Sequence, residues 1–251
     1  MRRKTLTEYL DGFLRIEQIE DQSQNGLQVD GPEEVTRVAF AVDGCEASFQ
    51  RAVDEDAQLL IVHHGLFWGE SLRVIGPHFR RLRVLMDGGC ALYGVHLPLD
   101  LHPQVGHNAE MVRLLDLADR EPFGDYHGVE IGFAGRFDHA LDMPALIGRV
   151  VEALGRPPIR VLDYGPEVIE RVACVSGGAA SMVEQVAEGG LDAYITGETS
   201  HAAFHQIVEL GLNVIFAGHY ATETLGLKAL AGHLEGKFGL ETIFLELPTG
   251  M

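Results

Sequence analysis

Short apolar runs alternate with segments of helical periodicity along most of the chain. The strand-like runs cover residues 37–43, 58–64, 90–96, 171–176, 192–198 and 213–219. Between them, residues 45–55, 179–189 and 199–210 place apolar side chains at the spacing of an amphipathic helix. Alternating β and α elements of this length predict an α/β fold with buried, largely parallel strands.

The pattern occurs twice. Residues 37–65 overlie residues 171–199 without a gap, so that strand, turn, helix and second strand fall in register. The third strands match as well, with His96 over His219 and Asp100 over Glu223. We therefore predict two similar α/β domains related by internal duplication, one over residues 1–124 and the other over residues 125–251. The alternative is chance similarity, because all α/β units share this pattern.

Composition and charge restrict the classes of function. The net charge is −18, and lysine occurs only at Lys4, Lys228 and Lys237. Such an acidic surface repels nucleic-acid phosphates, which disfavours nucleic-acid binding as the main activity. The scattered thiols Cys45, Cys90 and Cys174 argue against both a disulfide framework and a thiolate zinc site.

The apolar runs also bear on location. None reaches the ~18 residues that a membrane span needs. The N-terminal segment has basic residues but no apolar stretch behind them, so it does not read as a secretory signal. We expect a cytoplasmic protein without a membrane partner.

Polar side chains gather where the predicted strands end. Parallel α/β sheets bind ligands at the carboxyl ends of their strands. The residues at those ends are His63, His64, His96 and Asp100 in the first half, and Glu198, His219 and Glu223 in the second. We expect them to meet in a cleft between the two domains.

Imidazole and carboxylate together predict zinc, iron or manganese rather than calcium alone. Adjacent strand residues point to opposite faces, so His63 and His64 serve one site only if the backbone turns, which Gly65 permits. Two diverging imidazoles suit two divalent ions, and Asp100 and Glu223 can bridge ions about 3.5–4 Å apart. The alternative is a set of structural histidines. The repeated His-x-x-x-acid spacing favours the metal.

Several motifs at these positions resemble those of a known family. They are "QNGLQVDG" (24–31), "VHHGLFWG" (62–69), "LYGVHLPLD" (92–100), "ITGETSHAAFH" (195–205) and "AGHYATE" (217–223). In this order they resemble the Nif-three-like family of dinuclear-metal hexamers, often labelled type 2 GTP cyclohydrolase I, in its short bacterial form. The resemblance extends over essentially the whole chain.

The resemblance implies two divalent metals per chain and a toroidal homohexamer. It assigns the metal ligands to His63, His64, Asp100, His219 and Glu223. His96 would lie near the metals, and His205 would line the same pocket. The positions after "TGE" vary among relatives, so the resemblance assigns His201 no role; it is either a pocket residue or, as we slightly favour, a residue of a helix face.

These observations predict a metal-dependent hydrolase in which Glu198 or His96 moves protons. The family label implies GTP as substrate, with purine ring opening and release of formate. Phe67 and Trp68 would then stack on the base, although packing inside the protein explains them equally well. Arg80 and Arg81 would contact phosphate, or would simply lie on a solvated helix face.

Two other functions remain open at this stage. One is a metal-containing scaffold or metabolite-binding regulatory protein without turnover. The other is a phosphoesterase or amidohydrolase that uses the same metals. A closed coordination shell would favour the scaffold, whereas open positions on the metals favour catalysis.

Overall fold

The computed structural model describes residues 1–251 and divides into two compact units. The first unit comprises residues 1–99 and 227–247, and the second comprises residues 100–226 and 248–251. The C-terminal segment returns to the first unit because its last strand pairs with a strand near the N-terminus. These spatial units are not the same as the two predicted halves. The predicted boundary at residue 124 divides the two copies of the duplicated sequence, and it stays a prediction.

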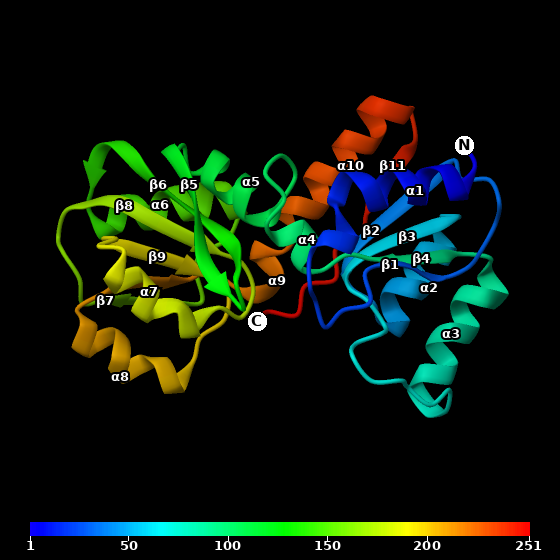
Figure 1. The fold of residues 1–251 in the computed structure, drawn as a ribbon, viewed down its shortest axis with the longest axis horizontal. Helices are drawn as coiled ribbons and strands as arrows, with labels where there is room; N and C mark the ends of the chain where they lie inside the picture. Colours follow the sequence, from blue (N-terminus) through cyan, green and yellow to red (C-terminus); the bar gives the residue numbers. More distant parts are fainter. The chain divides into compact units, whose positions relative to one another are not determined.

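A five-stranded sheet forms the first unit, in the order β1-β4-β3-β2-β11 (Figure 1). Only β1 is antiparallel to its neighbour; the other pairs are parallel. The strands are β1 (Gly26–Val29), β2 (Arg37–Asp43), β3 (Leu59–His64), β4 (Ala91–Gly94) and β11 (Glu241–Phe244). The helices are α1 (Arg3–Leu14), α2 (Glu46–Asp54), α3 (Gly76–Gly88) and α10 (Leu225–Phe238), with a short 3-10 turn at Ile16–Gln18.

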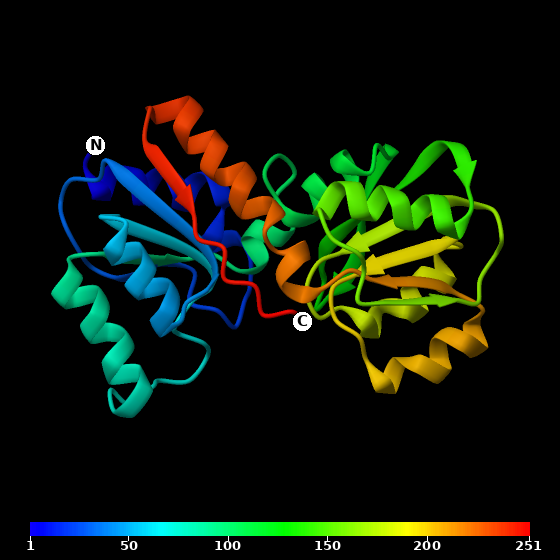
Figure 2. The ribbon, with the colours of Figure 1, turned by 180° about the vertical axis from the view of Figure 1, so that it is seen from behind.

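Helices cover both faces of this sheet. Figures 1 and 2 show α1 and α10 on one face and α2 and α3 on the other. Strands buried on both faces are apolar throughout, as in the "LLIV" of β3. The core between the sheet and α2 includes Phe49, Leu60 and Val62, all fully buried.

The second unit contains a six-stranded sheet in the order β5-β6-β8-β9-β10-β7. Its strands are β5 (Ala118–Tyr126), β6 (Val129–Leu141), β7 (Arg160–Asp163), β8 (Ile169–Val175), β9 (Ala193–Thr196) and β10 (Asn213–Phe216). Its helices are α5 (His107–Leu114), α6 (Met143–Leu154), α7 (Val183–Glu188), α8 (His201–Leu210) and α9 (His219–Thr222), with a 3-10 turn at Ala180–Met182. The short helix α4 (Leu97–Asp100) lies where the chain passes from the first unit to the second.

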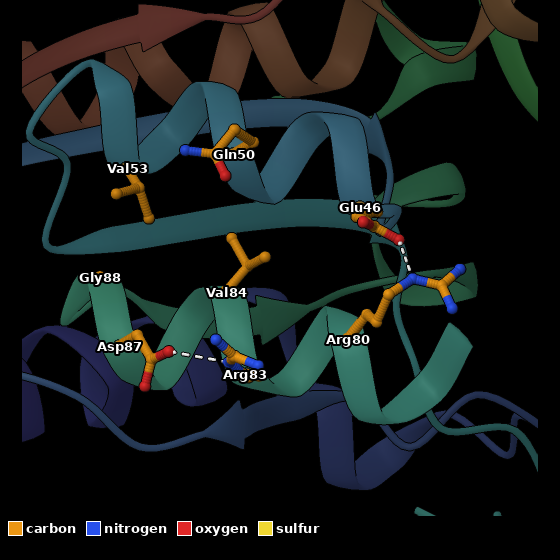
Figure 3. Close-up of a pocket in the computed structure, with 8 residues that line it drawn as sticks. All are labelled: Glu46, Gln50, Val53, Arg80, Arg83, Val84, Asp87 and Gly88. Atoms are coloured by element: carbon orange, nitrogen blue, oxygen red, sulfur yellow. Dashed lines mark hydrogen bonds and ion pairs between the residues drawn. The ribbon is translucent and has the colours of Figure 1, made fainter. Parts of the chain in front are cut away.

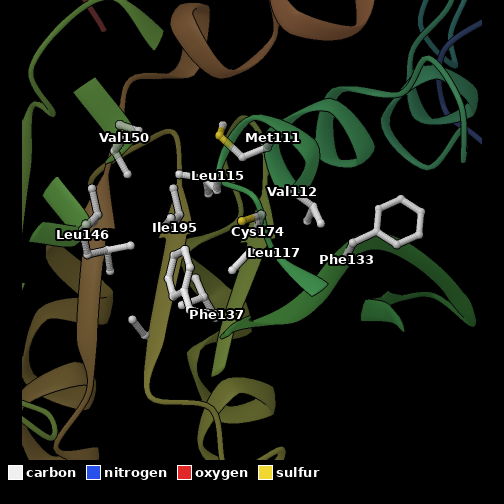
Figure 4. Packing of buried hydrophobic residues seen from close by; sticks show 14 of the residues in the cluster. Met111, Val112, Leu115, Leu117, Phe133, Phe137, Leu146, Val150, Cys174 and Ile195 are labelled. Atoms are coloured by element: carbon white, nitrogen blue, oxygen red, sulfur yellow. The ribbon is translucent and has the colours of Figure 1, made fainter. Parts of the chain in front are cut away.

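In this unit α5 and α6 pack on one face of the sheet. Figure 4 shows Met111 of α5, Leu115 directly after α5, Leu146 and Val150 of α6, and Cys174 of β8 in one apolar cluster. Burial raises the pKa of the Cys174 thiol far above its ordinary value. The thiol is therefore inert core filler.

The structure confirms the α/β fold class, and its strand pairing matches the internal overlay. Val38 pairs with Leu59 in the first sheet, and Val172 pairs with Ala193 at the overlaid positions of the second. In each unit the second of the three overlaid strands lies between the other two: β3 lies between β4 and β2, and β9 lies between β8 and β10. The repeated register agrees with an internal duplication.

Every predicted strand is present, most of them shorter than the apolar run that predicted it. The hairpin of β5 and β6 was not predicted, because β5 is mostly exposed and reads as a polar loop. As for membranes, none of the helices combines the length and the apolar character that crossing one requires.

Candidate metal centre

Three imidazoles gather at the carboxyl ends of β3 and β4 in the first unit. His63 and His64 end β3, and His96 follows β4 by two residues. The ring centroid of His63 lies 4.7 Å from that of His64 and 5.0 Å from that of His96. One nitrogen from each of the three rings lies within 4.8 Å of the others. Spacing of this kind allows the three rings to hold a metal ion.

The first two rings are held in place through Nδ1. His63 Nδ1 lies 3.0 Å from the carbonyl oxygen of Val95, and His64 Nδ1 lies 2.8 Å from the carboxylate of Asp43. These oxygens can only accept, so each Nδ1 carries the proton and each Nε2 presents its lone pair. Metal-binding histidines usually make this contact, because it fixes both the tautomer and the ring orientation.

His96 follows the same rule. Its Nδ1 lies 3.0 and 3.1 Å from the two carboxylate oxygens of Asp21, whose side chain is 3% exposed. Burial would raise the pKa of Asp21, but hydrogen bonds from His96, Asn25 and Ser23 outweigh it and lower the pKa to about 2. Asp21 is therefore a carboxylate at neutral pH and accepts the Nδ1 proton of His96.

Glycines next to the histidines leave room for Gln28 of β1. A Cβ on Gly65 would lie 2.3 Å from Gln28 Nε2, and one on Gly94 would lie 2.5 Å from it. Gln28 Oε1 in turn accepts the backbone N–H of Leu66 at 2.7 Å. Because Gly65 has no side chain, the Gln28 side chain can lie against its backbone, and this contact fixes the chain directly after the histidine pair.

Of the two aromatic residues predicted to stack on a base, only Trp68 contacts the imidazoles of the candidate site. Its ring lies edge-on to His96 at 4.8 Å, and its Nε1 donates to the carbonyl oxygen of Gly65 at 2.9 Å. Phe67 packs instead against the apolar core and edge-on to His78 at 5.6 Å. Trp68 is therefore the better placed of the two for a planar ligand.

In the second unit, His219 lies between two carboxylates. Its Nδ1 is 3.1 Å from Glu198 Oε1, and its Nε2 is 3.0 Å from Glu223 Oε1. Burial lowers the pKa of His219, but the two carboxylates outweigh burial and raise it to about 9. A nitrogen and a carboxylate oxygen that share a proton in this way can share a metal ion instead.

Asp100 begins the second unit and lies in a buried polar network. Its Oδ1 accepts from the Ser176 hydroxyl at 2.8 Å, and one nitrogen of His107 lies within 4.8 Å of its carboxylate. His107 Nδ1 accepts the Gly226 N–H at 3.0 Å, so its own proton is on Nε2. His107 belongs to none of the sequence motifs, yet the structure places it beside a predicted metal ligand.

The sequence patterns missed the residues that orient the imidazoles. Asp43 could have been found, because it ends the predicted strand 37–43 at the same sheet edge as His64. Asp21 lies in an irregular segment and Ser176 reads as a turn residue, so neither gave a signal. His205 lies exposed on α8 with its ring against Phe204, and its place in a pocket stays a prediction.

These donors fit a divalent metal. Imidazoles with the lone pair on Nε2, together with buried carboxylates, are the ligands of zinc, iron and manganese sites in proteins. The candidate donors are His63, His64 and His96 in the first unit, and Asp100, His219 and Glu223 in the second.

Comparisons with known proteins match nearly the whole chain. The family model described as Duf34/NIF3 (NGG1p interacting factor 3) matches residues 1–249. A "GTP cyclohydrolase 1 type 2 homolog" of Pyrococcus horikoshii is 44% identical over 251 residues, covering 100% of both chains. One of Deinococcus radiodurans is 43% identical over 249 residues, covering 99% of this chain and 94% of its own.

A solved structure agrees as well. The crystal structure of TTHA1606 from Thermus thermophilus superposes with a TM-score of 0.92 at 45% identity, covering 100% of both chains. Family model, relatives and fold thus coincide over the same residues. The chain belongs to the DUF34/NIF3 family.

Proposed function

We propose that this protein is a hydrolase that depends on a pair of divalent metals. The observation that carries the proposal is the orientation of its imidazoles. His63, His64 and His96 each have Nδ1 on an oxygen acceptor, so all three rings present the Nε2 lone pair. Histidines that serve packing alone have no reason to share one tautomer at one sheet edge.

The proposed ligands are those of the sequence-based prediction: His63, His64, Asp100, His219 and Glu223. When bound, the metals would lower the pKa of a coordinated water and supply hydroxide near neutral pH. Glu198 holds Nδ1 of His219 and so turns its Nε2 toward Glu223. His96, with its Nε2 lone pair, would take a proton from the attacking water or give it to the leaving group.

The proposed reaction is hydrolytic opening of a purine ring with release of formate, because the relatives carry the name GTP cyclohydrolase 1 type 2 homolog. Trp68 supports a planar substrate. Its half-buried indole lies beside His96 and His64, with centroid distances of 4.8 and 6.1 Å. A purine stacked on the indole would therefore lie next to the imidazoles.

We also propose that the chain assembles into a homohexamer. The motifs that resemble a family of hexamers motivate this proposal, and large apolar side chains left exposed around α3 support it. They are Leu72, Val74, Ile75, Phe79 and Met86, each 49–65% exposed. Exposed apolar patches of this kind mark surfaces that a partner covers. Light scattering on the purified chain would measure its mass.

The test of function is formate release from GTP by the chain loaded with zinc, manganese or iron. We expect release by the wild type and by His139→Ala, which removes an exposed histidine of β6, and loss of release in His64→Ala. Other nucleotides, phosphate esters and amides belong in the same panel. Turnover of one of these compounds but not of GTP would identify a different substrate for the hydrolase. Absence of any turnover by the metal-loaded protein would favour a metal-containing scaffold protein.

A further inference from the structure

The carboxylate of Asp21 receives hydrogen bonds from four donors. Oδ1 accepts the backbone N–H of Ser23 at 3.0 Å. Oδ2 accepts the side-chain N–H of Asn25 at 2.9 Å and the backbone N–H of Leu97 at 3.0 Å. The fourth donor is His96 Nδ1, at 3.0 Å from Oδ1 and 3.1 Å from Oδ2. A carboxylate offers about four lone-pair sites, so this one is saturated.

The same segment also holds the backbone of His96. The side-chain oxygen of Asn25 accepts the His96 N–H at 2.7 Å, while its side-chain nitrogen donates to Asp21. The Trp68 ring lies edge-on against the His96 ring. His96 is therefore held at its backbone N–H and at its Nδ1, and the Trp68 indole packs against its ring.

We propose that Asp21 is a positioning residue: it holds His96 in the tautomer with the proton on Nδ1, so that Nε2 presents a lone pair toward His63 and His64. Free histidine has no such constraint. The orientation is a property of this chain, whereas its use in proton transfer rests on the proposed hydrolase function. Asp21 itself acts only through His96.

The substitution Asp21→Asn gives a specific prediction because an amide has one acceptor and one donor end. At the Oδ2 position an NH₂ group would oppose two donors, Asn25 and Leu97. At the Oδ1 position it would oppose only the Ser23 N–H. The amide nitrogen should therefore occupy the Oδ1 position, where it would also donate to His96 Nδ1. The proton of His96 would then move to Nε2, and the lone pair facing the other imidazoles would be lost.

The experiment is long-range ¹H–¹⁵N NMR of the metal-free 251-residue chain at alkaline pH, where the spectrum of a neutral imidazole shows which nitrogen carries the proton. We expect the proton of His96 on Nδ1 in the wild type and on Nε2 in Asp21→Asn. The matched control is Asp11→Asn, which alters another half-buried aspartate of the first unit, hydrogen-bonded to Tyr93 at 2.8 Å. The control should leave the His96 tautomer unchanged.

A wild-type proton on Nε2 would overturn the proposal, even if Asp21→Asn does not fold. So would a folded Asp21→Asn variant that keeps the proton on Nδ1. With metal loaded and a substrate in hand, we expect kcat to fall about 10- to 100-fold in Asp21→Asn at unchanged KM and metal content. Absence of turnover in the wild type would defeat the proposed function, while the NMR result would still decide the role of Asp21.

Discussion

Gly177 supports Glu223, and its replacement by alanine tests the second unit of the candidate centre without removing a ligand. Gly177 has a φ of +66°, and an added Cβ would lie 2.4 Å from Glu223 Oε1. Ordinary van der Waals contact begins at 3.4 Å, so the carboxylate must retreat by about 1 Å. Glu223 is buried and 3.0 Å from His219 Nε2, so a retreat of this size breaks their contact.

Two costs follow, and they can be separated. A left-handed backbone costs a residue other than glycine about 1–2 kcal/mol. For a domain of this size that lowers Tm by about 2–8 °C. The displaced carboxylate should weaken metal binding by about 10- to 100-fold, as loss of a supporting contact does at other metal sites.

Gly190→Ala is the matched control. Gly190 lies in the same unit with a φ of +59°, but its added Cβ would meet nothing nearer than Arg171 Nη1 at 3.9 Å. We therefore expect the loss of Tm in both variants and the loss of metal affinity in Gly177→Ala alone. Thermal unfolding and metal titration measure the two effects. Wild-type metal affinity in Gly177→Ala, or an equal loss of affinity in Gly190→Ala, would show that Gly177 does not position Glu223 for metal binding.

Three further predictions concern the first unit. His78 is 8% exposed and neither of its ring nitrogens has a hydrogen-bond partner, so His78→Leu should raise Tm by about 2–4 °C, and a lower Tm would contradict this. Arg80 pairs with Glu46 at 3.0 Å beside the groove of about 460 Å³ between α2 and α3 (Figure 3). If Arg80 and Arg81 bind substrate phosphate, the double variant Arg80→Ala/Arg81→Ala should bind nucleotide about tenfold more weakly without losing metal. The control Arg149→Ala should bind nucleotide as the wild type does. Equal nucleotide affinity in the double variant and the wild type would show that these arginines do not contact the substrate. Trp68 is the only tryptophan, so cobalt binding should quench its emission, and unchanged emission of metal-loaded protein would place the ion elsewhere.

The sequence predicted those parts of the fold that rest on strong periodicity. Strand β3 is apolar along its length because helices cover both of its faces, and the same run carried His63 and His64 to the sheet edge. Strand β5 was not predicted because Gly124 is its only buried residue. Its pairing with β6 depends on a register that no local sequence pattern reveals. The return of β11 to β2 is likewise set by distant residues.

The candidate site was predictable to a similar extent. The sequence revealed residue pairs that recur at a fixed spacing, such as His96 with Asp100 and His219 with Glu223. Their hydrogen-bond partners did not, because Asp21 reaches His96 from an irregular segment 75 residues away in the chain. Aromatic residues were ambiguous for the same reason: Trp68 and Phe67 are neighbours in sequence, yet one contacts the imidazoles and the other the core.

Metal analysis of the purified chain decides whether the candidate ligands hold two metal ions. Wild-type protein, His63→Ala, Glu223→Ala and the exposed-site control His139→Ala would be loaded with zinc, desalted and measured by elemental analysis. We expect about two ions per chain in the wild type and in the control, as a dinuclear site requires. We expect fewer ions in His63→Ala and in Glu223→Ala. Wild-type protein without bound metal, or equal metal in all four proteins, would show that these residues do not hold a dinuclear centre.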